Sequence, residues 1–132
     1  MQPTQSPQML IVDDDAMIRK LFAMIILSEF PDAIIDQAEN GDEAISAFSK
    51  RRHELIILDL QMPSRDGREA YIGIEEICRK NKWDVPRVVF CTGYSPPESL
   101  QDIIRANPKH CLIRKPVRSD TLVDCVRKMM RS

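Results

Sequence analysis

The chain has 132 residues, which suits one domain and leaves little room for a second. Apolar residues make up 43% of it and the net charge is −1, so we exclude global disorder and a bulk charge that would attract nucleic acid or anionic membrane. No run of about 20 apolar residues is present, so no segment is predicted to span a membrane. The first residues lack the pattern of a signal peptide. We predict a disordered lead-in over residues 1–7 and one domain over residues 8–132.

Five short apolar runs alternate with longer helical patterns. The runs cover residues 9–12, 33–36, 54–59, 87–92 and 111–114. Three of them are almost continuously apolar, as expected for strands covered on both faces, whereas the run at 33–36 is weaker and is predicted to be an edge strand. Strand and helix alternate throughout, which predicts parallel strands joined by right-handed crossovers with helices on both faces.

The helical segments have readable starts and faces. The first, at about 15–28, is apolar on more than one side, and we expect it to be more buried than the others. Asn40 and Glu43 form a capping arrangement before the second helix, and Ser95 does the same in "SPPE" before the fourth. The last helix carries one apolar stripe, formed by Leu122, Cys125, Val126 and Met129.

The cysteines and histidines show no metal-binding pattern. The four cysteines lack CxxC spacing, and a reducing cytoplasm is the compartment we predict. Cys91 and Cys111 lie in apolar runs and are interpreted as small core residues. His53 and His110 are isolated and are interpreted as surface residues. Residues 101–132 hold eight Lys or Arg against three Asp, interpreted as solvated helix faces, with a docking face for an acidic partner as the alternative.

Charged and polar residues stand at the ends of four predicted strands. Asp13 and Asp14 follow the first strand, and the third, fourth and fifth end at Asp59, Thr92 and Lys115. The carboxyl ends of parallel strands meet at one edge of the sheet, which is where ligands bind in such folds. Carboxylates brought together repel one another unless a cation lies among them, and their oxygen atoms suit Mg²⁺.

This set of groups predicts a phosphoryl-transfer site. Asp59 would be the nucleophile, because a carboxylate can take phosphate to give an acyl phosphate. Mg²⁺ and Lys115 would neutralise charge on the transferred group, and Thr92 offers a hydroxyl. An acidic run such as "DDD" can instead be a helix N-terminus, where acids favour the helix dipole. That alternative does not explain complementary groups at four strand ends.

Five motifs give the chain a family resemblance over about residues 8–130. They are "LIVDDD", "ENGDEA", "LDLQMPSRDG", "CTGY" and "RKP". With them the sequence resembles the receiver domain of two-component response regulators. The resemblance implies an α/β fold of the flavodoxin type, a doubly wound five-stranded parallel sheet in the order 2-1-3-4-5 with five helices.

The resemblance also implies a role for each matching residue. Asp59 would be the phospho-acceptor, Thr92 would contact the phosphoryl group, and Lys115 would pair with that group. The resemblance further implies a cis peptide bond between Lys115 and Pro116. Gly67 matches the glycine after the acceptor. The Mg²⁺ ligands would be Asp13, Asp14, Asp59 and the backbone carbonyl of Gln61.

The same resemblance sets expectations for partners and output. Phosphate would come from a histidine kinase or a histidine phosphotransfer protein, with no direct contact to nucleic acid or membrane. A phosphorylation-dependent homodimer is left open, as is an origin in a hybrid sensor kinase. Leu112 stands where the family often has an aromatic residue, so we expect it to contribute little to output. Tyr94, two positions after Thr92, is expected to slow loss of the phosphate.

Two other classes remain as alternatives. A pseudo-receiver would be an interaction module that is never phosphorylated, and it would normally have lost part of the acidic set. An aspartate-nucleophile phosphatase also has acids after its first strand. It would need an Asp-x-Asp-x-Thr/Val pattern, which "DDDAM" does not complete, and a cap domain for which 132 residues leave no room. Otherwise we expect no enzyme activity beyond the domain's own phosphorylation and dephosphorylation.

Overall fold

The computed structural model describes residues 6–62, 67–93 and 98–131, in which strands and helices alternate along the chain. The strands are β1 (Gln8–Val12), β2 (Ile34–Ala38), β3 (Leu55–Asp59), β4 (Arg87–Thr92) and β5 (His110–Arg114). The helices are α1 (Ala16–Glu29), α2 (Gly41–Arg51), α3 (Gly67–Asn81), α4 (Glu98–Ala106) and α5 (Ser119–Arg131). The predictions for Tyr94, Ser95 and most of the lead-in fall outside the described residues.

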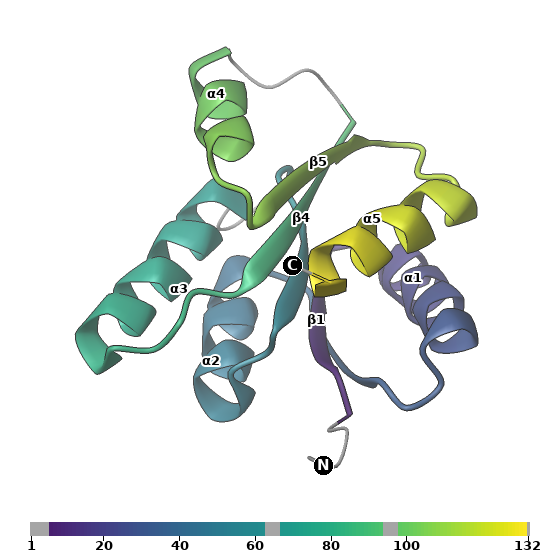
Figure 1. Cartoon of the computed structure of the whole chain (residues 1–132), viewed down its shortest axis with the longest axis horizontal. Coiled ribbons are helices and arrows are strands. Elements are labelled where there is room, and N and C mark those ends of the chain that lie inside the picture. The colour runs from purple at the N-terminus through teal and green to yellow at the C-terminus, as the bar shows by residue number, and fades with distance from the viewer. Residues whose placement is uncertain (1–5, 63–66, 94–97, 132) are drawn as a thin grey trace.

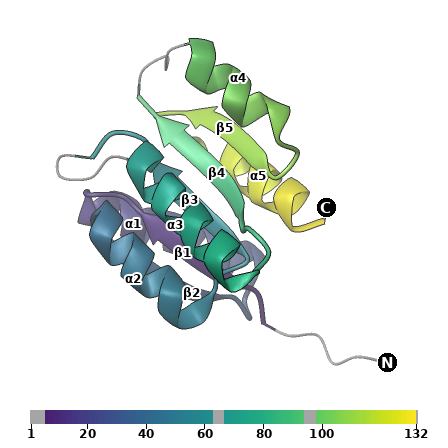
Figure 2. The ribbon, with the colours of Figure 1, turned by 90° about the vertical axis from the view of Figure 1, so that its left-hand side faces the viewer.

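The strands form one parallel sheet in the order β2-β1-β3-β4-β5. Helices α1 and α5 cover one face, and α2, α3 and α4 cover the other (Figures 1 and 2). The predicted doubly wound sheet and its strand order are therefore confirmed. This topology brings the ends of β1, β3, β4 and β5 to one edge of the sheet.

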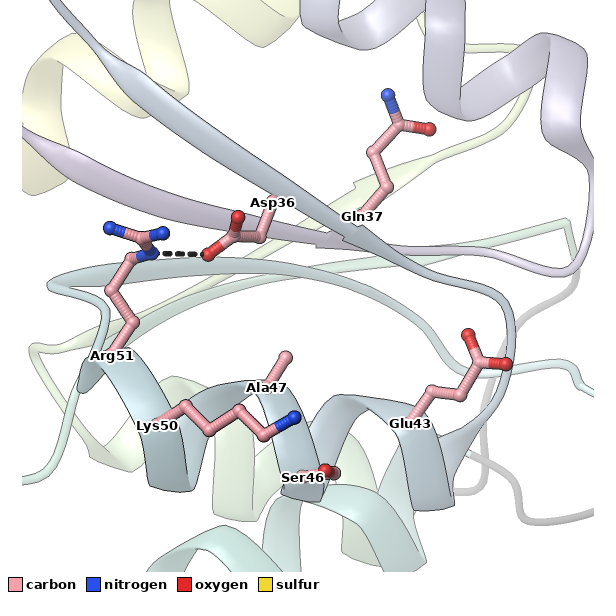
Figure 3. A pocket seen from close by; sticks show the side chains of 7 residues that line it. All are labelled: Asp36, Gln37, Glu43, Ser46, Ala47, Lys50 and Arg51. Carbon is pink, nitrogen blue, oxygen red and sulfur yellow. Dashed lines mark hydrogen bonds and ion pairs between the residues drawn. The ribbon is translucent and has the colours of Figure 1, made fainter.

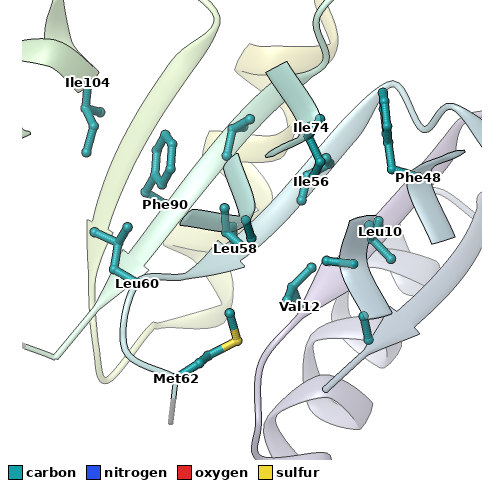
Figure 4. Packing of buried hydrophobic residues seen from close by; sticks show 14 of the residues in the cluster. Leu10, Val12, Phe48, Ile56, Leu58, Leu60, Met62, Ile74, Phe90 and Ile104 are labelled. Carbon is teal, nitrogen blue, oxygen red and sulfur yellow. The ribbon is translucent and has the colours of Figure 1, made fainter. Parts of the chain in front are cut away.

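The central strands are buried on both faces, which explains their continuous apolar runs. Leu10 and Ile56 point into the cluster beneath α2, α3 and α4 (Figure 4), and Ile11 and Ile57 point into the cluster beneath α1 and α5. Side chains of a strand alternate between its faces, so a strand covered on both faces is apolar at successive positions between its ends. By contrast, β2 leaves Ile34 exposed, as predicted for an edge strand.

Two helix predictions are confirmed. The Asn40 side chain accepts a hydrogen bond from the backbone N–H of Glu43 at 2.8 Å and so caps α2. The buried residues of α5 are the predicted stripe of Leu122, Cys125, Val126 and Met129. No helix in the described part of the chain is long and apolar enough to cross a membrane.

The prediction that α1 is unusually buried is wrong. Among its residues only Phe22 and Ile26 are buried, while Met17 is 80% and Met24 61% exposed. A helix packed on one face of a sheet buries a single stripe, so apolar residues on its other sides remain in solvent. The apolar character of this helix reflects an exposed surface and not deeper burial.

His53 is not a surface residue, contrary to the prediction. Its exposed fraction is 2%, and its Nε2 lies 2.7 Å from Asp36 Oδ2. His53 is buried because of the residue before it. Arg52 ends α2 in the left-handed backbone conformation, with φ of 54°, and so turns the chain back toward the sheet. The His53 ring then lies near the ring of Phe48, with centroids 6.4 Å apart. His110 is half-buried between the rings of Tyr71 and Phe90.

The cysteines divide into two kinds. Cys91 is buried with a free thiol, as predicted for a core residue. Cys111 is only partly buried and forms a disulfide with Cys125 of α5, so its interpretation as a simple core residue is wrong. The spacing of the two cysteines gave no sign of this pair, because it is made by the packing of α5 against β5.

Candidate functional site

The three aspartates after β1 have different positions. The backbone N–H of Asp13 donates to the carbonyl of Ala38 at 3.1 Å, which continues the pairing with β2 past the strand end. Asp15 caps α1, because its carboxylate accepts from the N–H of Met17 at 2.9 Å. Asp13 in turn accepts from the N–H of Asp15 at 2.9 Å. The interpretation of "DDD" as a helix N-terminus therefore holds for Asp15 alone. Asp13 and Asp14 lie at the edge of the sheet, in the group that also contains Asp59.

Asp59 ends β3 inside the protein, with an exposed fraction of 3%. Its Oδ1 accepts a hydrogen bond from the backbone N–H of Gln61 at 2.9 Å. Helix α3 begins directly against this backbone. A Cβ atom on Gly67 would lie 2.3 Å from the carbonyl oxygen of Asp59, so only glycine fits there without displacing the chain. The identity of Gly67 is thus set by how closely α3 approaches the end of β3.

The acidic residues come together at the strand ends. One carboxylate oxygen from each of Asp13, Asp14 and Asp59 lies within 4.8 Å of the others. Asp13 and Asp59 are buried, whereas Asp14 is exposed. The Lys115 Nζ reaches this group from the end of β5, at 2.9 Å from Asp13 Oδ2 and 3.3 Å from Asp59 Oδ2. The two buried carboxylates thus share one ammonium group, and with Asp14 beside them the cluster keeps an excess of negative charge.

The pKa shifts follow from this arrangement. Burial raises the pKa of the Asp59 carboxyl, and the charge of Asp13 adds to the rise, while the N–H of Gln61 and the ammonium of Lys115 oppose it. Burial would lower the pKa of Lys115, but its bond to Asp13 and the charge of Asp59 outweigh burial and raise that pKa. Lys115 therefore stays charged, and any further positive charge beside Asp59 would be stabilised.

Thr92 and Gln61 complete the edge. Thr92 is buried at the end of β4, and its carbonyl accepts from the N–H of Lys115 at 2.8 Å. The Gln61 side-chain oxygen accepts from the N–H of Gly93 at 3.0 Å and so joins the segments after β3 and β4. Sequence reasoning assigned Gln61 only a backbone carbonyl and missed this bridge, which has no sequence signal beyond its position near Asp59. The Lys115–Pro116 bond is cis, as the resemblance implied.

The donor set fits Mg²⁺. Its atoms are carboxylate oxygens, two of them on buried residues, and Lys115 leaves their charge incompletely balanced. Hard oxygen ligands with one or two carboxylates are what Mg²⁺ prefers. Cysteine, the softer type of ligand, does not take part in this group.

A second charged group lies away from this edge, beside a groove of about 530 Å³ between β2 and α2 (Figure 3). It consists of Asp36, Arg51 and His53 and is called the Asp36 cluster below. Asp36 Oδ2 lies 2.7 Å from both Arg51 Nε and His53 Nε2. Burial would raise the pKa of Asp36, but these two hydrogen bonds outweigh it and lower that pKa. The groove is lined by Asp36, Gln37, Glu43, Ser46, Ala47, Lys50 and Arg51.

Comparisons with known proteins agree with the fold. The family model of the response regulator receiver domain matches residues 9–127. The chemotaxis protein CheY of Halobacterium salinarum is 31% identical over 119 residues, which are 90% of this chain and 92% of that protein. The structure of CheY4 from Vibrio cholerae has a TM-score of 0.78 at 22% identity, covering 95% of this chain and 99% of that chain. A chain in the CheX–CheY–BeF3–Mg²⁺ complex from Borrelia burgdorferi has a TM-score of 0.73 at 23% identity, covering 95% and 87%.

Proposed function

Because the chain belongs to the response regulator receiver domain family, we propose that it is a signalling switch that accepts a phosphoryl group on Asp59. The observation that carries the proposal is the acidic cluster, in which the buried Asp59 carboxylate lies beside Asp13, Asp14 and the Lys115 ammonium. A buried carboxylate with excess negative charge around it is costly unless a cation joins it. Magnesium bound at this edge would offset the excess negative charge, and Asp59 would be the residue that accepts the phosphoryl group.

The chemistry at Asp59 follows from its two oxygen atoms. Oδ1 is held by the N–H of Gln61, and Oδ2 faces Lys115. A carboxylate oxygen of Asp59 would attack the phosphorus, the bond from phosphorus to the donor nitrogen would break, and an acyl phosphate would form. Lys115 would exchange its contact with Asp13 for the phosphoryl oxygens, and the Thr92 hydroxyl would donate to them.

Magnesium would be held by Asp13, Asp14 and Asp59, with the Gln61 carbonyl as the further ligand implied by the resemblance. When bound, it supplies positive charge that neutralises the phosphoryl oxygens. The solved complex with BeF3 and Mg²⁺ contains a chain of this fold, which supports the proposed binding of Mg²⁺ and of a phosphoryl group.

The donor would be a histidine kinase or a histidine phosphotransfer protein. That partner, a cytoplasmic location, the absence of nucleic-acid and membrane contact and the phosphorylation-dependent homodimer all stay predictions. The domain's own chemistry would be limited to gaining and losing phosphate. A pseudo-receiver would bind partners through the same fold without that chemistry.

The proposal is tested by treating the protein with acetyl phosphate and Mg²⁺ and measuring its intact mass. The wild-type protein should gain the mass of one phosphoryl group, and Asp59→Asn should gain none, because an amide is not a nucleophile for this transfer. Asp36→Asn is the matched control, because it changes a carboxylate of the same sheet outside the acidic cluster, and it should be labelled like wild type.

Two outcomes would contradict the proposal. Equal labelling of wild type and Asp59→Asn would move the acceptor elsewhere. No labelling of wild type, together with no binding of beryllofluoride and Mg²⁺, would support a pseudo-receiver. Repeated turnover of a generic phosphate ester would instead support a phosphatase.

A further inference from the structure

Strand β5 and helix α5 are joined by a bond between Cys111 and Cys125, separated by 14 residues in sequence. Cys111 is partly exposed on the edge strand, and Cys125 lies in the buried stripe of α5. Neither residue belongs to the acidic cluster. The pair is thus a chemical feature that the phosphorylation chemistry does not use.

The other two cysteines differ from this pair. Cys78 and Cys91 are each 1% exposed and carry free thiols. Burial raises the pKa of both thiols, to about 12 for Cys91, so very little of either is present as the reactive thiolate at neutral pH. Oxidation should therefore be selective for the pair that contains the partly exposed Cys111, and the buried Cys78 and Cys91 serve as internal controls.

Packing keeps the pair together without the bond. Leu122 and Val126 of α5 are fully buried and Met129 nearly so, in the apolar cluster beneath α1 and α5. These contacts are made by side chains other than the two cysteines, so we expect them to hold α5 against the sheet in the reduced protein as well. After reduction, the two thiols would remain neighbours and could pair again.

The bond encloses a functional segment. Lys115 lies between the two cysteines in sequence, and its Nζ contacts Asp13 and Asp59. The backbone N–H of Lys115 also donates to Thr92 at the end of β4. A link from β5 to α5 therefore fixes both ends of the segment that carries the lysine of the acidic site.

We propose that Cys111 and Cys125 form a reversible thiol–disulfide site that restrains the segment carrying Lys115. The co-reactant is a low-molecular-weight disulfide such as oxidised glutathione. The thiolate of Cys111, the more accessible sulfur, attacks the glutathione disulfide and releases one glutathione thiol. The thiolate of Cys125 then attacks the mixed disulfide at Cys111 and releases the second. The protein loses two hydrogen atoms and two electrons, and glutathione disulfide becomes two glutathione thiols.

The test is mass spectrometry of the whole protein equilibrated over a series of reduced and oxidised glutathione ratios, alkylated and cut with trypsin. Cleavage after Arg114 and Arg118 separates the cysteines, so the bond joins peptide 110–114 to peptide 119–127. We expect this pair at oxidising ratios, lighter by two hydrogen atoms than the two thiol peptides, and both peptides alkylated at reducing ratios. The peptides with Cys78 and Cys91 should show no disulfide at any ratio.

Either of two results would overturn the proposal. One is the absence of the joined peptides at every ratio, which would leave a pair of free thiols. The other is their persistence at the most reducing ratio, which would make the bond a fixed structural link. Cys111→Ser, which keeps the size of the side chain, should abolish the joined peptides and leave Cys125 alkylated.

A second measurement tests the restraint itself. Amide hydrogen exchange within residues 110–127 should be about tenfold slower or more in the oxidised protein than in the reduced protein, because the link removes local opening. Exchange in β1 and β2 should not change. Equal exchange of 110–127 in the two forms would show that the bond restrains nothing. None of these readouts requires phosphorylation, so they stand or fall independently of the proposed function.

Discussion

Asp59 at the end of β3 and Asp36 in β2 are both carboxylates of the same sheet that lie beside basic residues. Asp36 receives Arg51 and His53 on one oxygen, each at 2.7 Å, and its pKa is lowered. Asp59 shares the single ammonium of Lys115 with Asp13, and its pKa is raised mainly by burial. One carboxylate is stabilised by its neighbours, and the other is left with uncompensated charge.

The difference shows how to separate a structural carboxylate from a functional one. Proximity to a cation is common to both, so it does not distinguish them. What distinguishes them is the balance of charge around a buried group, since an unbalanced site gains from a ligand and a balanced one does not. The cluster at the strand ends should therefore bind a cation, and the Asp36 cluster should contribute to stability alone.

The largest effect we expect within this comparison concerns Mg²⁺ affinity. Asp14→Asn removes one charged ligand from the acidic cluster and should weaken Mg²⁺ binding by about tenfold or more, roughly 1.4 kcal/mol. Asp36→Asn should leave the affinity unchanged. Titration of each protein with Mg²⁺ without phosphate checks this, and equal affinity of wild type and Asp14→Asn would remove Asp14 from the site.

A smaller effect concerns pH and the balanced cluster. Burial lowers the pKa of His53, and its bond to Asp36 only partly opposes this. The folded protein therefore binds fewer protons than the unfolded chain below the ordinary histidine pKa of 6.5. The stability contributed by neutral His53 is complete above that pH and is lost as the pH falls through the folded pKa.

We expect His53→Gln to reduce the loss of unfolding free energy between about pH 7 and about pH 5, by up to about 1.4 kcal/mol per pH unit for one proton. Urea unfolding at several pH values measures it. Part of the dependence of unfolding free energy on pH should remain in this variant, because burial also lowers the pKa of His110. An unchanged slope in His53→Gln would show that the Asp36 cluster is not what sets the acid sensitivity.

The smallest effect is expected at Leu112. Its side chain is partly buried against the cluster beneath α2, α3 and α4, and it carries no polar group to exchange between solvent and core. Beryllofluoride with Mg²⁺ should shift amide resonances strongly at residues 13–15, 59–62 and 92–93, and weakly at Leu112. Changes centred on Leu112 and α5 would contradict this.

The grouping of Asp13, Asp14 and Asp59 was predicted correctly from the sequence. The carboxyl ends of parallel strands lie at one edge of the sheet, and this does not depend on how the helices pack. Prediction from the sequence failed at His53, because burial there depends on the left-handed residue Arg52, which turns the chain after α2. It also failed for α1, because apolar residues on several sides do not say which side meets the sheet. The Cys111–Cys125 pair depends on the packing of α5 on β5, and no spacing encodes that.

The most direct test of the charge-balance account is the unfolding free energy of Asp59→Asn and Asp36→Asn, measured with urea in the absence of Mg²⁺. Asp59→Asn should raise it by a few tenths to about 1 kcal/mol, because an amide relieves charge repulsion in a buried site. Asp36→Asn should lower it by about 1 kcal/mol, because two charge-assisted hydrogen bonds of a partly exposed carboxylate are weakened. Opposite signs would support the account, and a loss of stability in Asp59→Asn comparable to that in Asp36→Asn would contradict it.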